Sequence, residues 1–563
     1  MPTDARAQEQ VADAAHLRWR ALGVLALCAV WLFTGLLPHE PWKPDEAYTF
    51  GLVLHIVQTG DWVVPMLAGE PYLDRAPAYL LTAAALASGL SGLVELHDAA
   101  RLASGLYLAI TLGVLALTAR ELYGREHAWV APLALIGCVG LLVPGHQLIA
   151  NLAVLAGFAV ALYGMALARR RSLAGGLLLG TGVGLAFLAQ GVLAPAVLVA
   201  CALLLPLVGS PWRTRTFTAA LLCAIAAATP WLALWPMALH ARSPELFAQW
   251  IWVHNLGRIA EAARTGPVSV GSYLVMLLWY AWPALPLAGW VLWQRGRSAG
   301  STPQVRLPLL LLALGLLILP ASPDARELCS LPLLLPLALL ATASIDSLDR
   351  SAANFLDWFG ITTFGLCAIA LWIGYLALHT GVPTGLAREL AQFHPGFEPR
   401  FDPVALLLAA VATLGWVALV ARIGRSNRRA IINWAAGITL AWILTSLFFL
   451  AYIDHGRAYR GMVDSLGQAM PPRYDCVASR GLGESQRAML HYYAGLITVR
   501  EEAPGARDPA GCDVLLWQGW SWDADAIGAP WRRIWEGSRA GDRKELYRLY
   551  VREESRAPGG DPN

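Results

Sequence analysis

Long apolar segments recur along most of the chain, and they constrain the fold more than any other feature of the sequence. About 20 apolar residues in a row are enough for a helix to cross the hydrocarbon core of a bilayer. Charged residues make up only 14% of the 563 residues, against about 25% in soluble globular proteins. The sequence therefore predicts an all-α polytopic membrane protein with about thirteen transmembrane helices. The predicted spans are 21–38, 101–119, 128–148, 152–168, 174–189, 192–208, 217–237, 271–293, 307–321, 329–345, 356–379, 403–421 and 431–453.

Short clusters of arginine, such as Arg169 to Arg171, occupy alternate connections between these spans. Because positive charge resists translocation, the arginine-rich connections are expected on the cytoplasmic side. The N-terminal segment 1–20 is then cytoplasmic, and the chain ends outside. The apolar segment 79–93 would break this alternation as a full crossing, so we place it along the outer interface. The net charge of +3 is too small to indicate a nucleic-acid-binding protein.

The composition changes at the C-terminal end of the predicted transmembrane domain, 21–453. Residues 454–563 are polar and charged, with short strand-like segments around one helical pattern. They are predicted to form a small extracytoplasmic α/β domain. Cys476 and Cys512 each begin a predicted strand of that domain. An oxidising compartment favours a disulfide between them, with two free thiols as the alternative.

The first outer loop, 39–100, carries two adjacent carboxylates, Asp45 and Glu46. A helix is predicted from Pro44 to about Gln58, with apolar residues at spacings of three and four that suit a helix lying on the bilayer surface. Proline and acidic residues are common in the first turn of a helix, where they match the backbone geometry and the macrodipole. The two carboxylates are therefore either an ordinary helix start or part of an active site.

Arginine also occurs in three of the outer loops, where the positive-inside bias opposes it. Arg75 follows an acid in the first loop, Arg258 lies in the loop 238–270, and Arg326 lies in a third loop. A guanidinium makes bidentate, charge-assisted hydrogen bonds to phosphate, so these residues indicate an anionic ligand. Contacts to lipid headgroups or local ion pairs are the alternative for each arginine. The other candidate ligand-binding residues nearby are Tyr72, Tyr79, His254 and Asn255.

The order of short motifs in the first part of the chain resembles a known family. Pro44-Asp45-Glu46 is followed by Thr-Gly-Asp-Trp-Val-Val-Pro at 59–65, Gly-Glu-Pro-Tyr at 69–72, and Arg-Leu-Ala-Ser at 101–104. This order is similar to that in the membrane glycosyltransferases of the C-type superfamily. The likeness is to the lipid A aminoarabinose transferases and to the wider group related to protein O-mannosyltransferases. It covers roughly the first 345 residues.

The resemblance implies an enzyme of the bacterial inner membrane with the C-type glycosyltransferase fold. Such an enzyme moves a hexose or pentose from polyprenyl (undecaprenyl) phosphate to lipid A, another envelope glycan or a protein on the periplasmic face, with inversion. Asp45 would be the principal catalytic carboxylate, with Glu46 beside it. Arg75 and Arg258 would hold the donor phosphate, and Arg326 would face the acceptor.

The chain departs from the family pattern at three places. Asn151 stands where the family has an acid, and Gln190 stands where it has a lysine. The family's Lys-Pro-Pro is reduced to Arg-Ala-Pro at 75–77. Asn151 is therefore either a sugar ligand or a cap at a helix end, and Gln190 has the same two alternatives. Because the local charge differs, the resemblance implies sugar transfer more strongly than it implies aminoarabinose as the sugar.

No metal-binding, redox or nucleotide-binding spacing occurs in the sequence, so no cofactor is expected. Asp45, Glu46 and His55 leave a divalent cation as an open alternative. The main competing function is a transporter or flippase of lipid-linked sugars. Such a protein is expected to carry its functional charges near mid-membrane, whereas the acids and arginines discussed here concentrate in outer loops.

Overall fold

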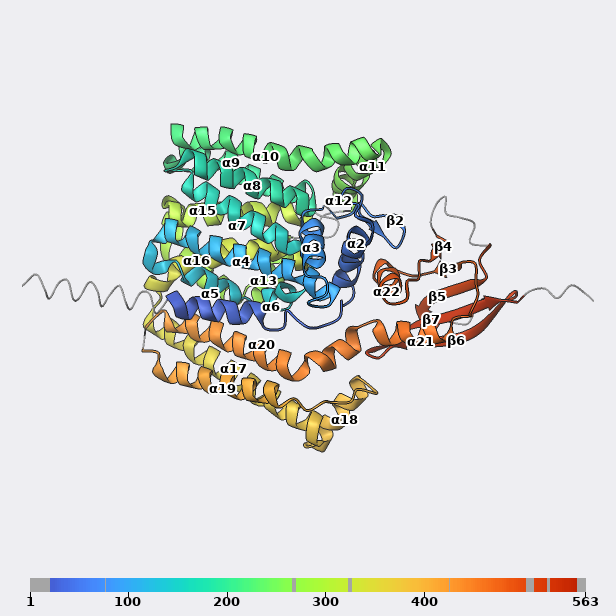
Figure 1. The fold of residues 1–563 in the computed structure, drawn as a ribbon. Helices are drawn as coiled ribbons and strands as arrows, with labels where there is room; N and C mark the ends of the chain where they lie inside the picture. Colours follow the sequence, from blue (N-terminus) through green and yellow to red (C-terminus); the bar gives the residue numbers. More distant parts are fainter. Residues whose placement is uncertain are drawn as a thin grey trace, which may run out of the picture.

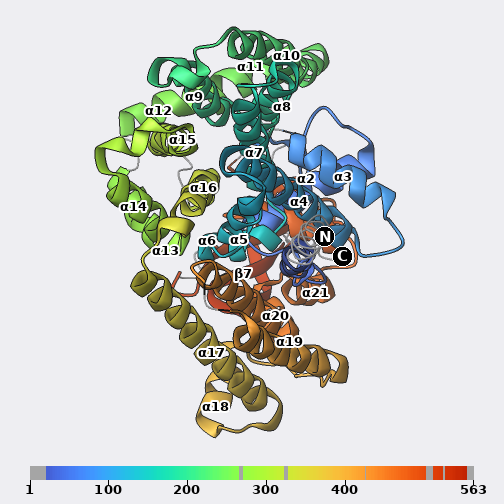
Figure 2. The same ribbon diagram turned by 90° about the vertical axis from the view of Figure 1, so that its left-hand side faces the viewer.

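The computed structural model describes residues 21–75, 77–265, 270–321, 327–424, 426–502, 511–523 and 527–553. The predicted cytoplasmic segment 1–20 lies outside the described residues. Long helices run side by side as a bundle, and a small sheet projects from one end of it (Figure 1). Seen from the opposite end, α17, α18 and α19 form an arm beside the main body of helices (Figure 2).

Among the described residues, eight helical stretches are long and apolar enough to cross a membrane, or up to ten if each of two bent pairs counts as one span. The mostly helical membrane fold is thereby confirmed, whereas thirteen crossings remain a prediction. The eight stretches are α4 (Leu96–Tyr123), α8 (Ser172–Gln190), α10 (Arg215–Arg242), α15 (Pro303–Ile318) with a 3₁₀ turn to Ala321, α16 (Leu334–Ser344) within Glu327–Ser347, α17 (Arg350–Thr380), α19 (Pro403–Arg422) and α20 (Arg429–Arg457) with α21 (Arg460–Ala469).

The remaining five predicted spans also fall in helices, but these are short or bent. The helix Ala21–Phe33, α7 (Asn151–Leu167) and α9 (Leu193–Val208) have fewer than 18 residues each. The segment Arg125–Ile136, which contains α5 (Val130–Ile136), meets Val139–His146, which contains α6 (Val139–Leu142), at 77°. Helix α13 (Val270–Tyr280) meets α14 (Ala284–Arg295) at 112°.

The two bends lie against each other. The backbone N–H of Val139 donates to the carbonyl oxygen of Trp282 over 3.3 Å. A backbone N–H at the first bend therefore has its hydrogen-bond acceptor at the second bend. Pro283, at the second bend, has no N–H to donate and therefore cannot continue the helical ladder. Apolar periodicity does not reveal such breaks, because the side chains on both sides of each bend remain apolar.

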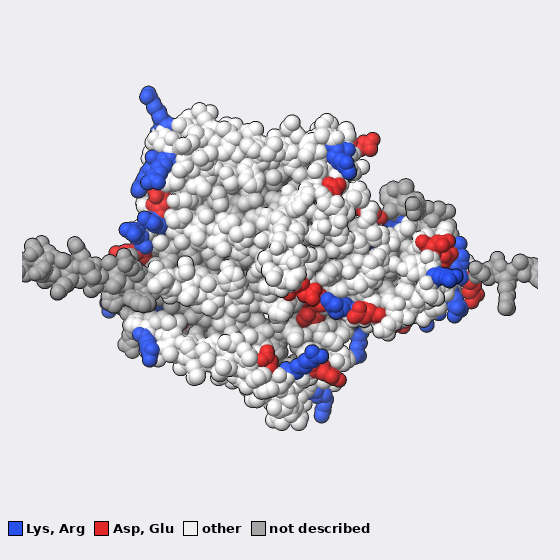
Figure 3. All heavy atoms as spheres, viewed as in Figure 1, with Lys and Arg blue, Asp and Glu red and all other residues white. Residues whose placement is uncertain are grey.

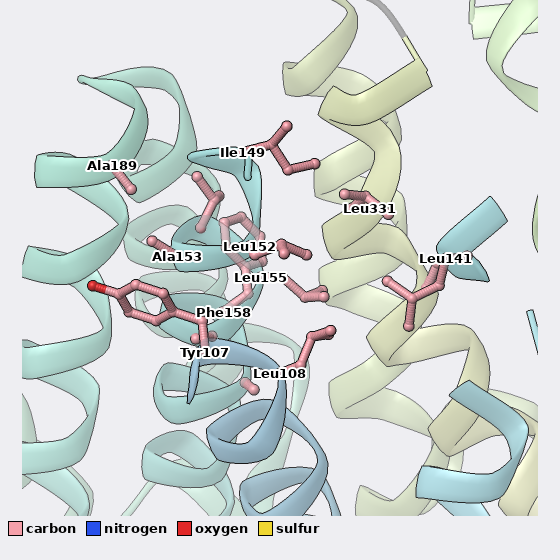
Figure 4. Packing of buried hydrophobic residues seen from close by; sticks show 14 of the residues in the cluster. Tyr107, Leu108, Leu141, Ile149, Leu152, Ala153, Leu155, Phe158, Ala189 and Leu331 are labelled. Atoms are coloured by element: carbon pink, nitrogen blue, oxygen red, sulfur yellow. The ribbon is translucent and has the colours of Figure 1, made fainter. Parts of the chain in front are cut away.

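The centre of the bundle is a continuous apolar core formed mainly by α4, α7, α8 and α16. Leu108 of α4, Leu155 of α7 and Leu331, in the 3₁₀ segment that leads into α16, are completely buried there, and Figure 4 shows these side chains in the core. Helices α7 and α8 approach closely through glycine. A Cβ on Gly164 would lie 2.5 Å from the backbone nitrogen of Leu179, so only glycine permits this contact, as is typical of helix pairs in membranes.

Charged side chains gather at the two ends of the bundle and leave a wide uncharged band between them (Figure 3). The charged residues at the end opposite the sheet are mainly arginines on this face. This distribution matches an uncharged section within the bilayer and charged ends in water.

Short elements cover the end of the bundle from which the sheet projects. Helix α2 covers Asp45–Thr59, close to the predicted range, and Gly60 ends it in the left-handed conformation with φ of 69°. Strands β1 (Met66–Leu67) and β2 (Glu70–Pro71) form an antiparallel hairpin. The other elements at this end are α3 (Ala78–Gly89), α11 (Pro244–Ala248), a π-helical segment Gln249–Gly257 and α12 (Arg258–Thr265), and α18 (Thr384–Phe393) lies at the tip of the arm.

The C-terminal part is a five-stranded sheet that is in contact with the two helices α21 and α22. The strand order is β4-β3-β5-β7-β6. Strand β3 is parallel to β4 and β5, and β7 is antiparallel to β5 and β6. A disulfide joins Cys476 to Cys512. The predicted boundary at residue 454 falls inside α20, because this helix runs on to Arg457. The elements are β3 (Val477–Arg480), α22 (Glu484–Ala494), β4 (Val499–Arg500), β5 (Val514–Trp520), β6 (Trp531–Arg539) and β7 (Asp542–Arg552).

Candidate active site

Asp45 is the first residue of α2 and keeps part of its carboxylate at the surface, with 19% of the side chain exposed. The hydroxyl of Tyr48, one helical turn on, donates to Asp45 Oδ1 over 2.8 Å. Arg75 Nη2 lies 3.9 Å from the same oxygen and donates to the Tyr48 hydroxyl oxygen over 2.7 Å. Tyr48 therefore links the carboxylate to the guanidinium, and it holds both groups at the same outer end of the molecule.

Asp74 pairs with the second arginine, Arg258, next to the group formed by Asp45, Tyr48 and Arg75. Its Oδ1 forms a short hydrogen bond with His254 Nδ1, and its Oδ2 lies 3.5 Å from Arg258 Nη2. Partial burial raises the pKa of Asp74, but His254, Arg258 and Arg75 outweigh this effect and lower the pKa below its usual range. Asp74 is therefore ionised at neutral pH and fixes the loop that carries Arg258 against the loop that carries Arg75.

The environment of Arg75 keeps its charge in place. Burial lowers the pKa of the guanidinium, but Tyr48, Tyr72 and Asp45 raise it above its usual value overall. Burial raises the pKa of the Tyr48 and Tyr72 hydroxyls, which therefore remain protonated. The Tyr72 ring lies 6.0 Å from the Tyr48 ring, centroid to centroid. Tyr72 thus borders the site as predicted, with a neutral hydroxyl.

Glu46 lies in a different environment from Asp45, although the two residues are adjacent. Its side chain is completely buried and pairs with Arg101, whose Nε donates to Glu46 Oε1 over 3.0 Å. The backbone N–H groups of Leu148 and Trp42 also donate to this carboxylate, over 2.8 and 3.2 Å. With three hydrogen bonds from the surrounding structure and no exposure to solvent, Glu46 positions α2. These contacts favour a structural role for Glu46, and a catalytic role for it stays a prediction.

Arg101 is buried in α4, and its hydrogen bonds connect this helix to the first outer loop. Its Nη1 donates to Asp98 Oδ1 over 2.6 Å and its Nη2 to the carbonyl oxygen of His39 over 2.9 Å. A buried guanidinium requires such a set of acceptors, because an unpaired charge is strongly destabilising there. The Arg-Leu-Ala-Ser motif therefore serves the fold by fixing the start of α2.

Two of the other candidate ligands are buried and hydrogen-bonded within the fold. Tyr79 is completely buried, and its hydroxyl is 2.6 Å from Ser104 Oγ, so it cannot contact a substrate without a rearrangement. Asn255 Oδ1 accepts from the N–H of Val192 over 3.3 Å and its Nδ2 donates to the carbonyl oxygen of Trp250 over 2.8 Å. Both atoms of the Asn255 amide are therefore occupied by the backbone.

The remaining candidates are less closely tied to the Asp45 group. Asn151 is buried at the first position of α7. Gln190 Nε2 donates to Cys329 Sγ over 3.3 Å. Arg326 lies outside the described residues. Of the predicted residues, the structure thus brings together Asp45, Arg75, His254, Arg258 and Tyr72.

A divalent cation site formed by Asp45, Glu46 and His55 is not assembled. Glu46 is used by Arg101, and His55 lies further along α2, where its Nε2 is 3.3 Å from Thr59 Oγ1. Within the part of the chain that the structure describes, no group of three or more His, Cys, Asp and Glu side chains could hold a metal ion.

Sequence reasoning overlooked two residues that organise this site. Tyr48 joins Asp45 to Arg75, and its spacing of three residues from Asp45 on a predicted helix was the available signal. Asp74 was noted only as the neighbour of Arg75. Its partners His254 and Arg258 are about 180 residues away in the sequence, and a single sequence carries no signal for that contact.

Comparisons with known proteins agree with the motifs. No protein-family model matches the chain. The undecaprenyl phosphate-alpha-4-amino-4-deoxy-L-arabinose arabinosyl transferase of Pseudomonas savastanoi pv. phaseolicola is 28% identical over 458 residues, covering 77% of this chain and 78% of that protein. The protein of the same name from Pseudomonas aeruginosa strain UCBPP-PA14 is 29% identical over 446 residues, covering 77% and 76%.

The fold is also that of a solved structure. ArnT from Cupriavidus metallidurans bound to undecaprenyl phosphate superimposes with a TM-score of 0.66 at 17% identity, over 94% of this chain and 98% of that chain. The likeness extends over the C-terminal sheet as well as the bundle, which goes beyond the first 345 residues noted in the sequence. The resemblance that the motifs predicted is therefore confirmed: the chain is similar to the aminoarabinose transferases in sequence and has the ArnT fold.

Proposed function

We propose that this protein is an inverting glycosyltransferase that moves a sugar from polyprenyl phosphate to an acceptor at the outer face of the bacterial inner membrane. The observation that carries the proposal is the grouping of a partly exposed carboxylate, Asp45, with Arg75 at 3.9 Å and with the loop of Arg258 held by Asp74. The similar proteins from Pseudomonas carry a transferase name with undecaprenyl phosphate in it, and they give no support to a transporter.

The two arginines suit the departing phosphate. When the anomeric carbon–oxygen bond breaks, the carrier phosphate regains its full charge, and a preorganised cation at a water-poor interface stabilises it. Arg75 is already held by Tyr48 and Arg258 by Asp74. Little reorganisation is therefore required as the charge develops.

Asp45 suits the acceptor side of the reaction. An acceptor hydroxyl that attacks the anomeric carbon loses its proton, and Asp45 would take it as a general base, an effect worth typically 10²–10⁴-fold. If the acceptor is a phosphate, little base is needed, and Asp45 would orient the acceptor or stabilise the positive charge on the sugar. Direct displacement inverts the anomeric centre in both cases.

The proposed topology follows from the charge distribution. Residues 1–20 would lie in the cytoplasm, 21–453 would form the glycosyltransferase domain with about thirteen crossings, and 454–563 would lie in the periplasm. The arginine-rich end of the bundle (Figure 3) supports a cytoplasmic assignment for that end. The disulfide between Cys476 and Cys512 supports an oxidising compartment for the sheet.

The sugar and the acceptor form the open part of the proposal. The names of the similar proteins make undecaprenyl phosphate-linked aminoarabinose the first donor to examine, with lipid A, another envelope glycan or a protein as acceptor. Comparing the lipids and glycans of cells with and without the protein would identify the acceptor.

The proposal is tested with the full-length protein in nanodiscs and a radiolabelled undecaprenyl phosphate sugar. We expect Arg75→Ala and Arg258→Ala to weaken binding of undecaprenyl phosphate and to slow transfer. Arg264→Ala is the matched control, because Arg264 is exposed on the same helix as Arg258. Donor binding that is unaltered in both variants would contradict the phosphate-binding role.

A further inference from the structure

The C-terminal sheet domain is in close contact with the helix that carries Asp45. Helix α22 lies beside α2 (Figure 1). A Cβ added at Gly51 of α2 would lie 2.6 Å from the Cβ of Ala488 in α22 and 2.8 Å from Leu67 Cδ1. Gly51 therefore allows the two helices to approach more closely than any side chain at this position would.

Two polar contacts join the same domain to the residues directly before Asp45. Lys43 Nζ donates to Glu545 Oε2 over 2.7 Å and lies 3.8 Å from Asp542 Oδ2. The Ser485 hydroxyl donates to the carbonyl oxygen of Pro44 over 2.8 Å. The backbone that leads into the first turn of α2 is thus held by the C-terminal domain at two consecutive residues.

Glu545, the partner of Lys43, is firmly fixed within its own domain. Only 3% of its surface is exposed. Its Oε1 accepts from Gln486 Nε2 and from the Tyr547 hydroxyl, over 2.7 and 2.8 Å, and Arg539 Nη2 lies 3.1 Å from Oε2. Lys43 therefore contacts a carboxylate that cannot move independently of the sheet.

The domain also holds the hairpin that precedes Arg75. Arg487 Nη2 donates to the carbonyl oxygen of Ala68 over 3.3 Å and lies 3.1 Å from Glu70 Oε1. Arg500 Nη2 lies 2.7 Å from Glu70 Oε2. The residues before Asp45 and the residues before Arg75 are consequently anchored to the same rigid unit.

We propose that the C-terminal domain positions the catalytic carboxylate, with Lys43 and Ser485 as the positioning residues. Neither residue needs to touch the substrate, because each acts through the backbone next to Asp45. A displacement of about 1 Å in an active site can lower the rate by about 100-fold. We therefore expect the contacts that hold the first turn of α2 to affect kcat. The kinetic test of this inference rests on the proposed glycosyl transfer, whereas the structural test described below does not.

The first test disturbs the contact between α2 and α22 with one substitution and restores it with a second. Gly51→Ala in the full-length protein puts a methyl group where Ala488 lies, although alanine is the better helix former. We expect kcat to fall by about 10- to 100-fold, with binding of undecaprenyl phosphate unchanged. Adding Ala488→Gly removes the clashing methyl group of α22 and leaves only the end of the flexible Leu67 side chain to shift. This double variant is expected to restore kcat to within about threefold of wild type.

The second test removes the charge contact without touching the interface between helices. Lys43→Met is expected to lower kcat while donor binding stays the same, and Lys43→Arg is expected to retain most of the activity. Arg543→Ala is the control, because Arg543 is exposed beside Asp542. Wild-type kcat in both Lys43→Met and Gly51→Ala would overturn the proposal.

Amide hydrogen exchange over residues 42–52 supplies a readout that needs no transferase activity. We expect faster exchange in Gly51→Ala and Lys43→Met, and wild-type exchange in the Gly51→Ala, Ala488→Gly double variant. If the wild-type protein transfers no sugar, the proposed function fails, and exchange alone then decides the positioning role. Unchanged exchange in both single variants would refute it.

Discussion

At the residue scale, the two adjacent carboxylates at the start of α2 lie in different environments because their neighbours differ. Asp45 is partly exposed beside Arg75, whereas Glu46 is buried against Arg101. Their positions as first and second residues of the helix turn them about 100° apart, so one faces outward and the other inward. Sequence proximity therefore does not imply a shared catalytic role.

The buried pair leads to a stability prediction. Glu46→Ala leaves the buried Arg101 with one carboxylate partner, Asp98, instead of two, and we expect a loss of about 3–5 kcal/mol. Asp45→Ala is expected to cost less, about 1–2 kcal/mol, because it removes a partly exposed carboxylate that accepts one hydrogen bond from Tyr48 and adds a favourable charge at the helix N-terminus. Thermal unfolding in nanodiscs measures both. Equal destabilisation by the two substitutions would contradict the different roles assigned here.

Asp74 is predicted to influence donor binding through Arg258. Asp74→Asn removes the charge that pairs with Arg258 and His254. A hydrogen bond to a charged group contributes about 1.5–3 kcal/mol, so we expect the affinity for the donor to fall by about tenfold or more. Asp464→Asn is the control, because Asp464 is exposed on α21. Binding of undecaprenyl phosphate that is indistinguishable from wild type would count against this role.

Part of the site could be predicted from residue types and short motifs. Arg75 and Arg258 stand out because the positive-inside bias opposes arginine in outer loops, and Asp45 stands out beside Glu46 in the Pro-Asp-Glu motif. The structure places the three residues together. Tyr79 and Asn255 were polar and suitably placed in the sequence. Their hydrogen-bond partners Ser104 and Val192 lie 25 and 63 residues away along the chain. Such long-range packing is not encoded in local patterns.

At the scale of elements, hydrophobicity located the helices but not their shapes. All thirteen predicted spans coincide with helices or bent pairs. The bends after Ile136 and Tyr280 were not predicted, because apolar side chains continue through both. Strand β6 (Trp531–Arg539) was also missed, since its mixture of aromatic and charged residues lacks clear alternation.

The contact between Lys43 and Glu545 predicts a pH dependence. Burial raises the pKa of Glu545, but Lys43, Tyr547 and Arg539 lower it below its usual value. The stabilisation is therefore fully present above the unfolded-state pKa of about 4.3, and it is lost as the pH falls through the lower pKa of the folded state.

This dependence can be measured as the difference in melting temperature between the wild-type protein and Lys43→Met. We expect a constant difference between pH 8 and pH 6, and a smaller one below about pH 4. A difference that already disappears between pH 8 and pH 6 would show that another group controls this contact.

At the scale of the whole molecule, the charge pattern and the C-terminal sheet define opposite ends. The sheet, α2 and the hairpin β1–β2 lie at one end of the bundle, and the arginine-rich connections lie at the other (Figures 1 and 3). An odd number of crossings would place residues 1–20 and 454–563 on opposite sides of the membrane.

Topology reporters test this arrangement. Alkaline phosphatase folds only in an oxidising compartment, so a fusion after residue 553 is expected to be active, and a fusion in the connection around Arg213 is expected to be inactive. Activity of both fusions, or of the second alone, would contradict the proposed orientation.

The central claim is that Asp45 takes part in sugar transfer while Glu46 maintains the fold. Its most direct test is a single-turnover assay of Asp45→Asn with a labelled undecaprenyl phosphate sugar and membrane lipid acceptors. Asparagine keeps the size of the side chain but cannot accept a proton as a base. We predict that transfer falls by about 10²–10⁴-fold, with donor binding and thermal stability unchanged. Transfer at the wild-type rate by a well-folded Asp45→Asn protein would contradict the account.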